Sequence, residues 1–518
     1  MRLLRLLLLL LASLSQAWAY SYLVIANTAA KSHFYVGQAL AKGLVGAGHE
    51  VTMVSPFPQK KPLKNFVDVA TPNVITAMEV HKARIFDVVK IPIVFRVPLM
   101  HAMGLKLTRT LLAEPAVQTL LAENRTFDAV LCEIFMNDAH YGFAEHFQAP
   151  LIAFSSFGAS SWSNPLVGTP SPPSYVPHFL LQFSDHMTFF ERARNLIFTA
   201  FEYIYHTFFY LPQQEQIYRE FFPRNKQSFD EMRRNTALVL LNNHISLGFP
   251  RPYAPNMIEV GGMHINRKRQ PLPQDIEDFI KGAKHGVIYF SMGSNLKSKD
   301  LPQKKRQAII ETFGKLKQRV LWKFEEPNLV GKPANVFISD WFPQDDILAH
   351  ENVILFITHG GLLSTTESIY HGKPIVGIPI FGDQFVNMAR AEQLGYGVTV
   401  AFDKLTAETF HNAINQILSD PRYAQQMREM SARFRDQHET PLERAVYWVE
   451  HVTRQKGAKY LRSASQDLNF IQYHNLDVFA MIVGGLISIT FAVIYILAIV
   501  VRFIRRILQG KAGKVKKN

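Results

Sequence analysis

The sequence contains very little cysteine: Cys132 is the only one among 518 residues. A single thiol cannot form an intrachain disulfide, which excludes the small disulfide-scaffold proteins. Gly and Pro number 28 each, and there is no repeat of 20–50 residues and no low-complexity segment, so collagen-like and solenoid proteins are excluded as well. With 48% hydrophobic residues, a chain of this length is expected to form about two to four domains, each with its own hydrophobic core.

Charge is absent from one long stretch near the C-terminal end. Residues 478–501 carry no charged side chain, and as a helix they would extend about 36 Å, enough to cross a hydrocarbon core of about 30 Å. The tail that follows, 502–518, lacks acidic residues and contains seven Lys and Arg residues. Because the positive-inside rule places such a tail in the cytosol, we expect a transmembrane helix over 478–501 and a basic cytosolic tail.

The first 19 residues combine the three parts of a secretory signal peptide. Arg2 and Arg5 form a short basic region, residues 6–11 are all Leu, and Ala17-Trp18-Ala19 fits an A-x-A cleavage site. Together with the anchor, this leader predicts a single-pass type I protein whose folded part lies in the secretory lumen. The ending Lys514-Val-Lys-Lys-Asn518 has the K-x-K-x-x form of retrieval signals, so we expect residence in the endoplasmic reticulum membrane.

The net charge of +14 would by itself suggest a nucleic-acid or membrane partner. Seven of the positive charges lie in the tail and two in the leader, which leaves +5 for the rest of the chain. A basic tail beside a membrane is typical of topology and of attraction to anionic lipid. We therefore expect membrane lipid, and no nucleic acid, among the partners. The sequon Asn124-Arg125-Thr126 makes Asn124 a candidate glycosylation site in this topology.

The luminal part alternates between apolar strands and amphipathic helices. Near the start, two apolar runs (21–27 and 49–55) flank a segment in which Val36, Leu40 and Leu44 recur with helical spacing. A more regular alternation follows residue 286, with a helix expected at about 304–317 and strands near 286–291, 320–323, 336–339, 354–358, 375–378 and 397–400. Near-continuous apolar strands are typical of parallel sheets covered on both faces. The pattern predicts an α/β protein with two Rossmann-like domains, 20–250 and 251–476, joined by a linker over 249–273.

Residues 179–210 are unusual within the first of these domains, because they contain eleven Phe and Tyr in 32 residues. Buried helices of a large domain are one interpretation. The other is a surface that contacts lipophilic ligands or the membrane, since exposed aromatic faces of that size need a reason.

A string of polar residues between 341 and 384 falls at strand ends and helix starts of the second domain. Thr358 ends an apolar strand, His359-Gly360-Gly361 forms a tight turn, and a helix continues to His371. The free N–H groups and positive dipole end at the start of that helix suit a diphosphate. Glu367 lies about 12 Å further along, so one helix could contact both a diphosphate and ribose hydroxyls. Groups suited to a base and to sugar hydroxyls are Trp341, Gln344, Asp383 and Gln384.

This combination resembles the signature of the UDP-glycosyltransferases, in their membrane-anchored animal branch. The residues that carry the resemblance are Phe356-Ile-Thr-His-Gly-Gly361, Glu367, Pro374, Pro379 and Asp383-Gln384. It extends over essentially the full length, through the leader, Ser32-His33, Gly261-Gly262, Phe290-Ser-Met-Gly-Ser294, the anchor and the basic tail. The resemblance implies a GT-B fold, in which two Rossmann-like domains face each other across a cleft and the C-terminal one binds a UDP-sugar.

The resemblance also implies roles for individual residues on the donor side. Trp341 would stack on uracil, Gln344 would contact the base or ribose, and Glu367 would hold the ribose hydroxyls. The diphosphate would be held by His359, the backbone near Gly360 and Gly361, and Ser294. Asp383 and Gln384 would bind the transferred sugar. Many relatives carry Asn where this chain has Leu363, so one contact is either missing or supplied by Ser364.

On the acceptor side the reaction calls for a general base with a pKa near 7, and histidine is the natural choice. His33 follows the first strand, at the sheet edge where ligands bind in this architecture. By itself such a histidine is more often an ordinary surface residue, but the resemblance identifies it as the base. Two residues could supply the carboxylate that partners His33. Glu133 aligns with the Asp of relatives but has one more methylene, whereas Asp138 is an Asp but lies about one turn further along the chain.

The implied reaction is a single displacement at the anomeric carbon with inversion. No D-x-D motif and no clustered His and Cys are present in the sequence, so neither a metal nor another cofactor is expected, and UDP-sugar is a co-substrate. The acceptor is expected to be a small lipophilic molecule with a hydroxyl. The donor sugar is glucose or glucuronic acid, with a lean toward glucose because Glu133 and Leu363 resemble insect members. Two other functions stay open, a non-catalytic binder of lipophilic molecules and a lipid-specific glycosyltransferase, as does assembly into a homo- or hetero-oligomer.

Overall fold

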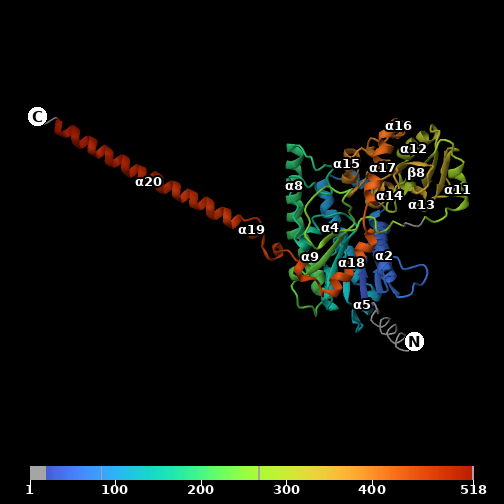
Figure 1. Cartoon of the computed structure of the whole chain (residues 1–518), viewed down its shortest axis with the longest axis horizontal. Helices are drawn as coiled ribbons and strands as arrows, with labels where there is room; N and C mark the ends of the chain where they lie inside the picture. Colours follow the sequence, from blue (N-terminus) through green and yellow to red (C-terminus); the bar gives the residue numbers. More distant parts are fainter. Residues whose placement is uncertain (1–18, 83–84, 266–268, 516–518) are drawn as a thin grey trace, which may run out of the picture. The chain divides into compact units, whose positions relative to one another are not determined.

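The computed structural model describes residues 19–82, 85–265 and 269–515, and the expected signal peptide lies outside this part of the chain except for Ala19. Contacts between residues separate a compact unit that ends at Arg462 from a second unit that begins at Ser463. Within the first unit the described strands form two sheets, and all the pairings in both are parallel (Figure 1). The expected α/β class with two Rossmann-like domains is confirmed.

The first sheet has the strand order β3-β2-β1-β4-β5-β6-β7. Its strands are β1 (Ser21–Ile25), β2 (Glu50–Ser55), β3 (Phe66–Ala70), β4 (Ala129–Glu133), β5 (Leu151–Ser155), β6 (Thr236–Leu241) and β7 (Met257–Glu259). The second sheet has the order β10-β9-β8-β11-β12-β13. It contains β8 (Val287–Ser291), β9 (Arg319–Lys323), β10 (Val336–Ser339), β11 (Val353–Thr358), β12 (Ile375–Gly377) and β13 (Gly397–Thr399), each within a residue or two of its expected position.

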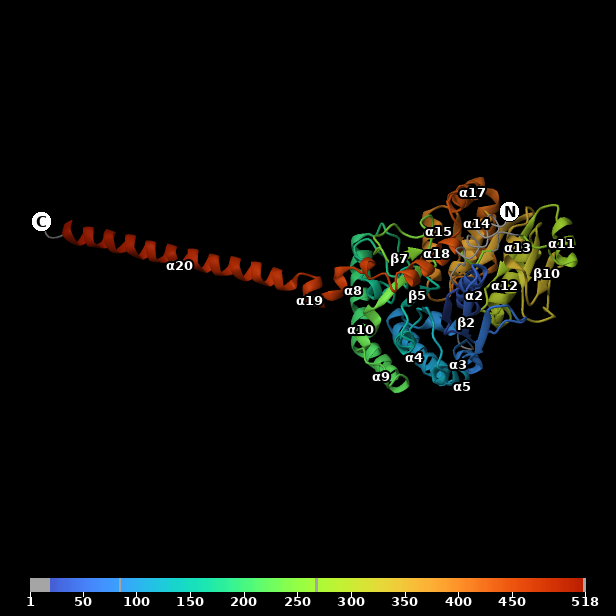
Figure 2. The ribbon, with the colours of Figure 1, turned by 60° about the horizontal axis from the view of Figure 1, so that its bottom comes forward.

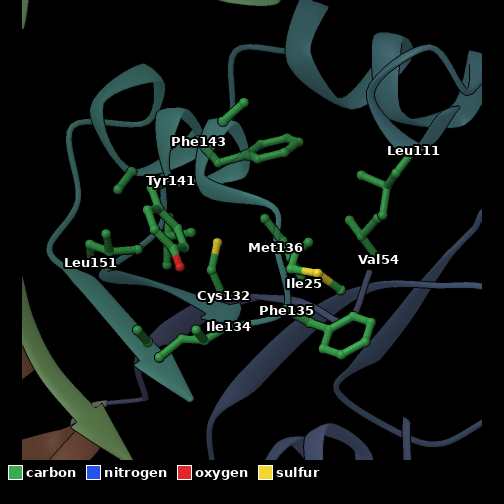
Figure 3. Close-up of a cluster of buried hydrophobic side chains, with 14 of the residues drawn as sticks. Ile25, Val54, Leu111, Cys132, Ile134, Phe135, Met136, Tyr141, Phe143 and Leu151 are labelled. Atoms are coloured by element: carbon green, nitrogen blue, oxygen red, sulfur yellow. The ribbon is translucent and has the colours of Figure 1, made fainter. Parts of the chain in front are cut away.

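Neighbouring side chains of the central strands belong to different hydrophobic cores, because strand side chains alternate between the two faces of a sheet. On one face Leu23 and Ile25 of β1 pack with Cys132 of β4 (Figure 3). On the other face Tyr22 and Val24 belong to a separate cluster. Both faces are buried, which explains why these strands are apolar at nearly every position. Burial also raises the pKa of the Cys132 thiol, so this thiol is unreactive in the folded chain.

Helices cover both faces of each sheet (Figure 2). Those of the first domain are α2 (Lys31–Gly46), α3 (Pro72–Lys82), η1 (Ile85–Lys90), α4 (Ile93–Leu112), α5 (Pro115–Ala122), η2 (Asp138–Tyr141), α6 (Gly142–His146), α7 (Asn164–Val167), α8 (Phe189–Tyr205), the π-helix η3 (His206–Tyr210), α9 (Leu211–Phe221) and α10 (Phe229–Arg234). Those of the second part of the unit are α11 (Gln274–Lys281), η4 (Ser298–Asp300), α12 (Gln303–Gly314), α13 (Gln344–Leu348), α14 (Leu362–Tyr370), α15 (Gln384–Gln393), α16 (Ala407–Ser419), α17 (Pro421–Arg435), α18 (Pro441–Arg454) and η5 (Lys459–Leu461).

The division between the two domains differs from the expected boundary at residue 250. Strand β7 lies within the segment expected to be a linker, yet it pairs with β6 as the last strand of the first sheet. Further along the chain, α18 returns to the first domain and packs on α2 and β6. Its Ala445, Val449 and Val452 belong to the same hydrophobic cluster as Tyr22 and Val24 of β1. The first domain therefore includes α18, which lies near the C-terminal end of the first unit.

Both sheets have a point at which the strand order reverses along the chain. In the first sheet this point lies between β1 and β4, and in the second it lies between β8 and β11. Open parallel sheets leave a crevice at the carboxyl ends of the strands at such a point, because the flanking connections go to opposite sides. The segments that follow β1, β4, β8 and β11 are therefore the ones positioned to form a site.

The second unit, described by itself, contains η6 (Ala464–Asp467), α19 (Phe470–Tyr473) and the long helix α20 (Leu476–Val515). Residues 476–509 of α20 are long and apolar enough to cross a membrane. The expected span of 478–501 lies inside this segment.

We predict that the contact of α18 with α2 is needed for stability. A side chain added at Gly43 of α2 would collide with Leu442 of α18, since a Cβ there would lie 2.7 Å from Leu442 Cδ1. Gly43→Val is expected to destabilise the folded unit by about 1–3 kcal/mol, measured as the melting temperature of the detergent-solubilised chain. Gly46→Val in the same helix is the matched control, because a Cβ there meets no atom within 4 Å. Equal losses in both variants would contradict the proposed packing.

Candidate functional site

A cleft of about 1290 Å³ lies at the carboxyl ends of both sheets and is lined by residues of both domains. His33 and Phe135 line it from the first domain, and His359 and Asp383 line it from the second. All the residues expected to bind the donor, apart from Gly360, line this one cleft. The two reversal points therefore contribute to a single site.

His33 lies in the first turn of α2, close after the end of β1. Its Nδ1 is 2.6 Å from Glu133 Oε1, and the edges of Phe135 and Phe157 pack against its ring. A carboxylate can only accept a hydrogen bond, so Nδ1 carries the hydrogen and Nε2 is left as the ring nitrogen that can take a proton. The imidazole is thus held in one tautomer at the wall of the cleft.

Glu133 is the last residue of β4, and its side chain is fully buried. Besides His33, its carboxylate accepts hydrogen bonds from the hydroxyl of Ser156 at 2.7 Å and from the backbone N–H of Asn27 at 3.2 Å. Asn27 follows β1 and Ser156 follows β5, so the partners come from the ends of both strands that flank β4. A buried carboxylate needs partners of this kind, and the sheet itself supplies them.

Asp138, the other candidate partner of His33, lies in a different place. It opens η2 after β4, and its Oδ1 accepts a hydrogen bond of 2.7 Å from Nε of Arg233 in α10. Both side chains are buried. Of the two candidates left open by the sequence, Glu133 is therefore the one that contacts His33, because one turn of extra chain carries the carboxylate of Asp138 to Arg233 instead.

The turn after β11 holds His359 between two glycines. A Cβ on Gly293, which follows β8, would lie 2.6 Å from Cε1 of the His359 ring, and a Cβ on Gly361 would collide with the same ring. Gly293 and Gly360 have positive φ values of 84° and 81°, which favour glycine. Burial, and secondly the charge of Lys323, lower the pKa of His359 to about 4. This histidine is therefore neutral near pH 7 and can donate one hydrogen bond beside the N-terminus of α14.

Lys323 is a cation at this end of the cleft that no sequence motif indicated. It ends β9, and its Nζ donates to the carbonyl of Gly293 at 3.1 Å and pairs with Glu325 at 2.7 Å. It lines the same cleft as His359. A neutral donor, a cation and the free N–H groups at the start of α14 together suit a diphosphate.

Gln344, Ser364 and Glu367 form one hydrogen-bonded group. The Nε2 of Gln344 donates to Ser364 Oγ at 3.0 Å and to Glu367 Oε2 at 2.6 Å, while Tyr289 donates to its Oε1 at 3.3 Å. Trp341, just before α13, is 49% exposed and lines the cleft, and Nζ of Lys31 lies over its ring, 5.2 Å from the centroid. This arrangement offers a flat apolar shelf next to hydrogen-bonding groups, as a nucleoside requires.

Asp383 and Gln384 lie at the start of α15. Asp383 accepts a hydrogen bond of 2.8 Å from Asn387, whose Nδ2 also donates to the carbonyl of Gly360. Burial raises the pKa of Asp383. The Oε1 of Gln384 accepts from the backbone N–H groups of residues 380 and 381, so its amide NH₂ remains for a ligand.

Leu363, where an Asn was expected from the resemblance, has a structural role. It packs against the apolar cluster of the first domain that contains Phe34 and Val36. Ser364, the expected substitute for the missing contact, is hydrogen-bonded toward Gln344. At position 363 this chain therefore has an apolar side chain that contacts the first domain, in place of the polar Asn of many relatives.

Most of the cleft wall that comes from the first domain is apolar, although Asp87, Lys90 and Arg96 also line it. Its lining side chains include Met78, Ile91, Ile93, Leu99, Met100, Met103, Phe135, Phe157, Trp162, Phe179 and Leu180. This wall suits a lipophilic molecule. Asn124, the candidate glycosylation site, lies exposed after the end of α5.

The site residues that the motifs missed share one signal. Ser156 follows β5 directly, and Lys323 is the last residue of β9. Each is a polar side chain at the carboxyl end of an apolar strand, which is where sites form in parallel sheets. Finding Ser156 would have required recognition of β5 in the less regular first half.

Comparisons with known proteins agree with this geometry. The family model described as "UDP-glucoronosyl and UDP-glucosyl transferase" matches residues 30–515. UDP-glycosyltransferase UGT5 of Dactylopius coccus is 34% identical over 97% of this chain and 96% of its own length. UDP-glucosyltransferase 2 of the same insect is 35% identical, covering 94% of both chains. Human UDP-glucuronosyltransferase 1A8 is 36% identical over 76% of this chain and 72% of its own.

Solved structures of glycosyltransferases share the fold. The calicheamicin glycosyltransferase CalG4 has a TM-score of 0.56 at 17% identity, covering 84% of this chain and 99% of its own. A UDP-glucosyltransferase from Polygonum tinctorium has a TM-score of 0.57 at 16% identity, covering 85% and 100%. The expected GT-B fold is confirmed.

The separation of the two carboxylates leads to a prediction about stability. Asp138→Asn would remove the buried counter-charge of Arg233 and leave only the exposed Asp230 at 4.0 Å, and breaking such a buried pair costs about 3–5 kcal/mol. We expect a clearly lower melting temperature for this variant. Glu133→Gln is the matched control, since an amide can still bond to Ser156 and His33, and its melting temperature should fall less. If Asp138→Asn were as stable as the unmodified chain, the Arg233 pair would not be structural.

Proposed function

Because the chain belongs to the family of UDP-glucuronosyl and UDP-glucosyl transferases, and is thus a UDP-sugar glycosyltransferase, we propose that it transfers a hexosyl group to a hydroxyl of small lipophilic acceptors with inversion. His33 is the general base in this proposal, and Glu133 orients it. The observation that carries the proposal is the Glu133–His33 pair on the wall of the same cleft as His359, Lys323 and the start of α14.

The two halves of the site face the same cleft. His33 of the first domain and Asp383 and Gln384 of the second all line it. A sugar held by Asp383 and Gln384 would therefore lie in the cleft whose opposite wall carries His33. This shared cleft supports a direct attack by an acceptor bound on the apolar wall.

The proposed reaction is a single displacement. The acceptor hydroxyl gives its proton to Nε2 of His33 while its oxygen forms a bond to the anomeric carbon. The bond from that carbon to the diphosphate oxygen breaks, and its electron pair leaves with UDP. Attack from the side opposite the leaving group inverts the anomeric configuration. Glu133 stabilises the imidazolium that forms, since its carboxylate already accepts the Nδ1 hydrogen bond.

We assign the donor contacts as follows. Uracil stacks on Trp341, the ribose hydroxyls bond to Glu367, and Gln344 contacts the base or ribose. The diphosphate is received by His359, Lys323, Ser294 and the N–H groups near Gly360 and Gly361, which stabilise the charge that develops as UDP leaves. The step needs no metal ion to supply the base or to hold the leaving group, and an assay with a metal chelator tests this.

We propose glucose as the sugar rather than glucuronic acid. A C6 carboxylate would require a cation near the sugar, but the cations that line the described cleft are already positioned elsewhere. Lys323 is bonded to Glu325 next to Gly293, whereas Lys90 and Arg96 lie on the acceptor side. The relative named UDP-glucosyltransferase 2, which covers 94% of this chain, supports the same choice.

We further propose that the enzyme is a single-pass type I protein of the endoplasmic reticulum membrane. The apolar helix α20 and the basic residues that follow residue 501 support this topology. The catalytic unit would be luminal, so Asn124 would be glycosylated. A glycosidase-sensitive shift in mass that is lost in Asn124→Gln tests this orientation.

Replacement of the base should abolish turnover without abolishing donor binding. We expect His33→Ala to lower kcat by about 10²–10⁴-fold for an alcohol acceptor, because general bases contribute about that much. UDP affinity, measured by calorimetry, should stay within about twofold, since the UDP contacts assigned above come from the second domain. Glu133→Gln should lower kcat while preserving UDP affinity. An active His33→Ala variant would rule out this mechanism.

The donor sugar can be tested directly with the purified full chain. Release of UDP should be faster with UDP-glucose than with UDP-glucuronic acid at equal concentration and with the same phenolic acceptor. The competing donor should still bind, since both share the UDP contacts, and should inhibit with a constant near that of UDP. A higher kcat/KM for UDP-glucuronic acid would overturn the choice of glucose and leave the proposed base intact.

A further inference from the structure

His264 is a buried histidine that the proposed reaction does not use. It lies in a short segment, 261–265, that follows β7 and leads from the first sheet toward the second. Its side chain is 5% exposed, and its Nε2 lies 3.4 Å from Oε1 of Glu367. Neither nitrogen of this ring has a hydrogen-bond partner among the described residues. Buried polar groups without a partner are costly and uncommon, so the position of this ring requires an explanation.

The two glycines before His264 fix the path of the chain. The N–H of Gly261 donates to the carbonyl of Asn243 at 2.8 Å, and a Cβ on Gly261 would lie 2.6 Å from that carbonyl. Gly262 has a φ of 93°, and a Cβ there would lie 2.8 Å from Cζ of Phe434. Both positions therefore require glycine, the first because of a close approach and the second because of its backbone conformation as well. The ring of His264 is thus carried to one place.

The segment also joins the two domains. The residue before His264, Met263, is buried in a hydrophobic cluster of the first domain. The residue after it, Ile265, packs against a hydrophobic cluster of the second domain. The contact with Glu367 therefore links this connection to α14, and packing in both domains holds the ring beside the carboxylate.

The two oxygens of the Glu367 carboxylate have different surroundings. Oε2 accepts the 2.6 Å hydrogen bond from Gln344, whereas Oε1 faces His264. Glu367 lines the cleft, and the ribose hydroxyls are assigned to it. To accept hydrogen bonds from two neighbouring hydroxyls, a carboxylate must keep its plane in one orientation, and such a geometry depends on the groups behind it. A donor at Oε1 would complete what Gln344 begins at Oε2.

We propose that His264 positions Glu367 for the ribose of the donor, by donating a hydrogen bond from Nε2 to Oε1 when the nucleotide is bound. This inference rests on the proposed assignment of the ribose to Glu367. Hydrogen bonds from N–H to oxygen are about 2.7–3.2 Å long, so an approach of about half an ångström completes the bond. His264 is not among the described residues that line the cleft. It acts through Glu367 and is a positioning residue.

Calorimetry of the full chain with two nucleotides tests the proposal. One is UDP, and the other is 2′,3′-dideoxyuridine diphosphate, which lacks both ribose hydroxyls. His264→Phe fills the same space without an N–H group, and we expect it to weaken the binding of UDP about tenfold. Its affinity for the dideoxy nucleotide should stay within about twofold of the unmodified chain. Met263→Leu is the matched control in the same segment, and it should bind both nucleotides as the unmodified chain does.

Two further variants guard against an effect on folding alone. His264→Gln keeps an N–H donor at about the distance of Nε2 and should recover most of the affinity for UDP. His264→Asn has a shorter amide that does not reach Oε1, so it should reproduce the selective loss if the Phe variant proves unstable. A merely structural histidine would give another pattern, because Phe removes the unpartnered nitrogens. The melting temperature would then stay equal or rise, and UDP would bind as before, which would overturn the proposal.

Glu367→Ala separates this proposal from the assignment on which it rests. If Glu367 holds the ribose, this variant loses affinity for UDP but not for the dideoxy nucleotide. Adding His264→Phe should then cause no further loss, because the two side chains act as one unit. If Glu367→Ala shows the selective loss and His264→Phe does not, Glu367 holds the ribose without His264, and only the present proposal is overturned. Equal losses for both nucleotides in Glu367→Ala would overturn the ribose assignment, and the role of His264 with it.

Turnover gives an independent measurement. In His264→Phe, KM for the UDP-sugar should rise about tenfold while kcat stays within about twofold, because His33 and the diphosphate contacts are unchanged. A fall in kcat at an unchanged KM would contradict a role in holding the ribose.

Discussion

The hydrogen bond between Glu133 and His33 determines how the first half of this molecule is built. A carboxylate that is fully buried at the end of β4 requires partners, and the partners must come from chain segments that end at the same edge of the sheet. Neighbouring parallel strands meet this requirement, because the residues that follow β1, β4 and β5 lie at the same carboxyl edge of the sheet. One of these segments is the start of α2, which carries His33. The fold thus places an imidazole beside a carboxylate, and the hydrogen bonds leave few degrees of freedom to either group.

The second domain has the same architecture but a different arrangement of charges at the edge of its sheet. Its reversal point holds a histidine whose pKa is lowered to about 4, so that it acts as a neutral hydrogen-bond donor. Glycines on both sides admit the ring, and a lysine from the neighbouring strand contributes the positive charge. The two histidines follow different strands at the reversal points, β1 for His33 and β11 for His359, and they lie in opposite electrostatic surroundings. His33 is paired with a carboxylate and can accept a proton, whereas His359 has no acid partner among the described residues and lies next to a cation.

Much of the second domain could be predicted from the sequence, and less of the first. Strands β8 to β13 are short apolar runs separated by clear turn residues, so their positions were expected to within about two residues. In the first half β7 was expected to be part of a linker, because three residues carry too little periodicity to be recognised, and its membership in the sheet depends on pairing with β6. The return of α18 depends on contacts with α2 that no local pattern records. The choice between Glu133 and Asp138 required the direction of each side chain, and the path of the aromatic segment 179–210 over the surface required the buried partners of Glu202.

If His33 removes the acceptor proton during transfer, its loss should affect two acceptors with different needs for a base differently. An aliphatic alcohol must lose its proton as it attacks, whereas a nitrophenol is already ionised at an alkaline assay pH and has no proton to lose. The measurement is the ratio of kcat/KM between the unmodified chain and His33→Ala for each acceptor at the same pH. We expect a ratio of about 10²–10⁴ for the alcohol and a ratio close to one for the ionised phenol. Equal ratios for both acceptors would show that His33 contributes to binding or structure and not to proton transfer.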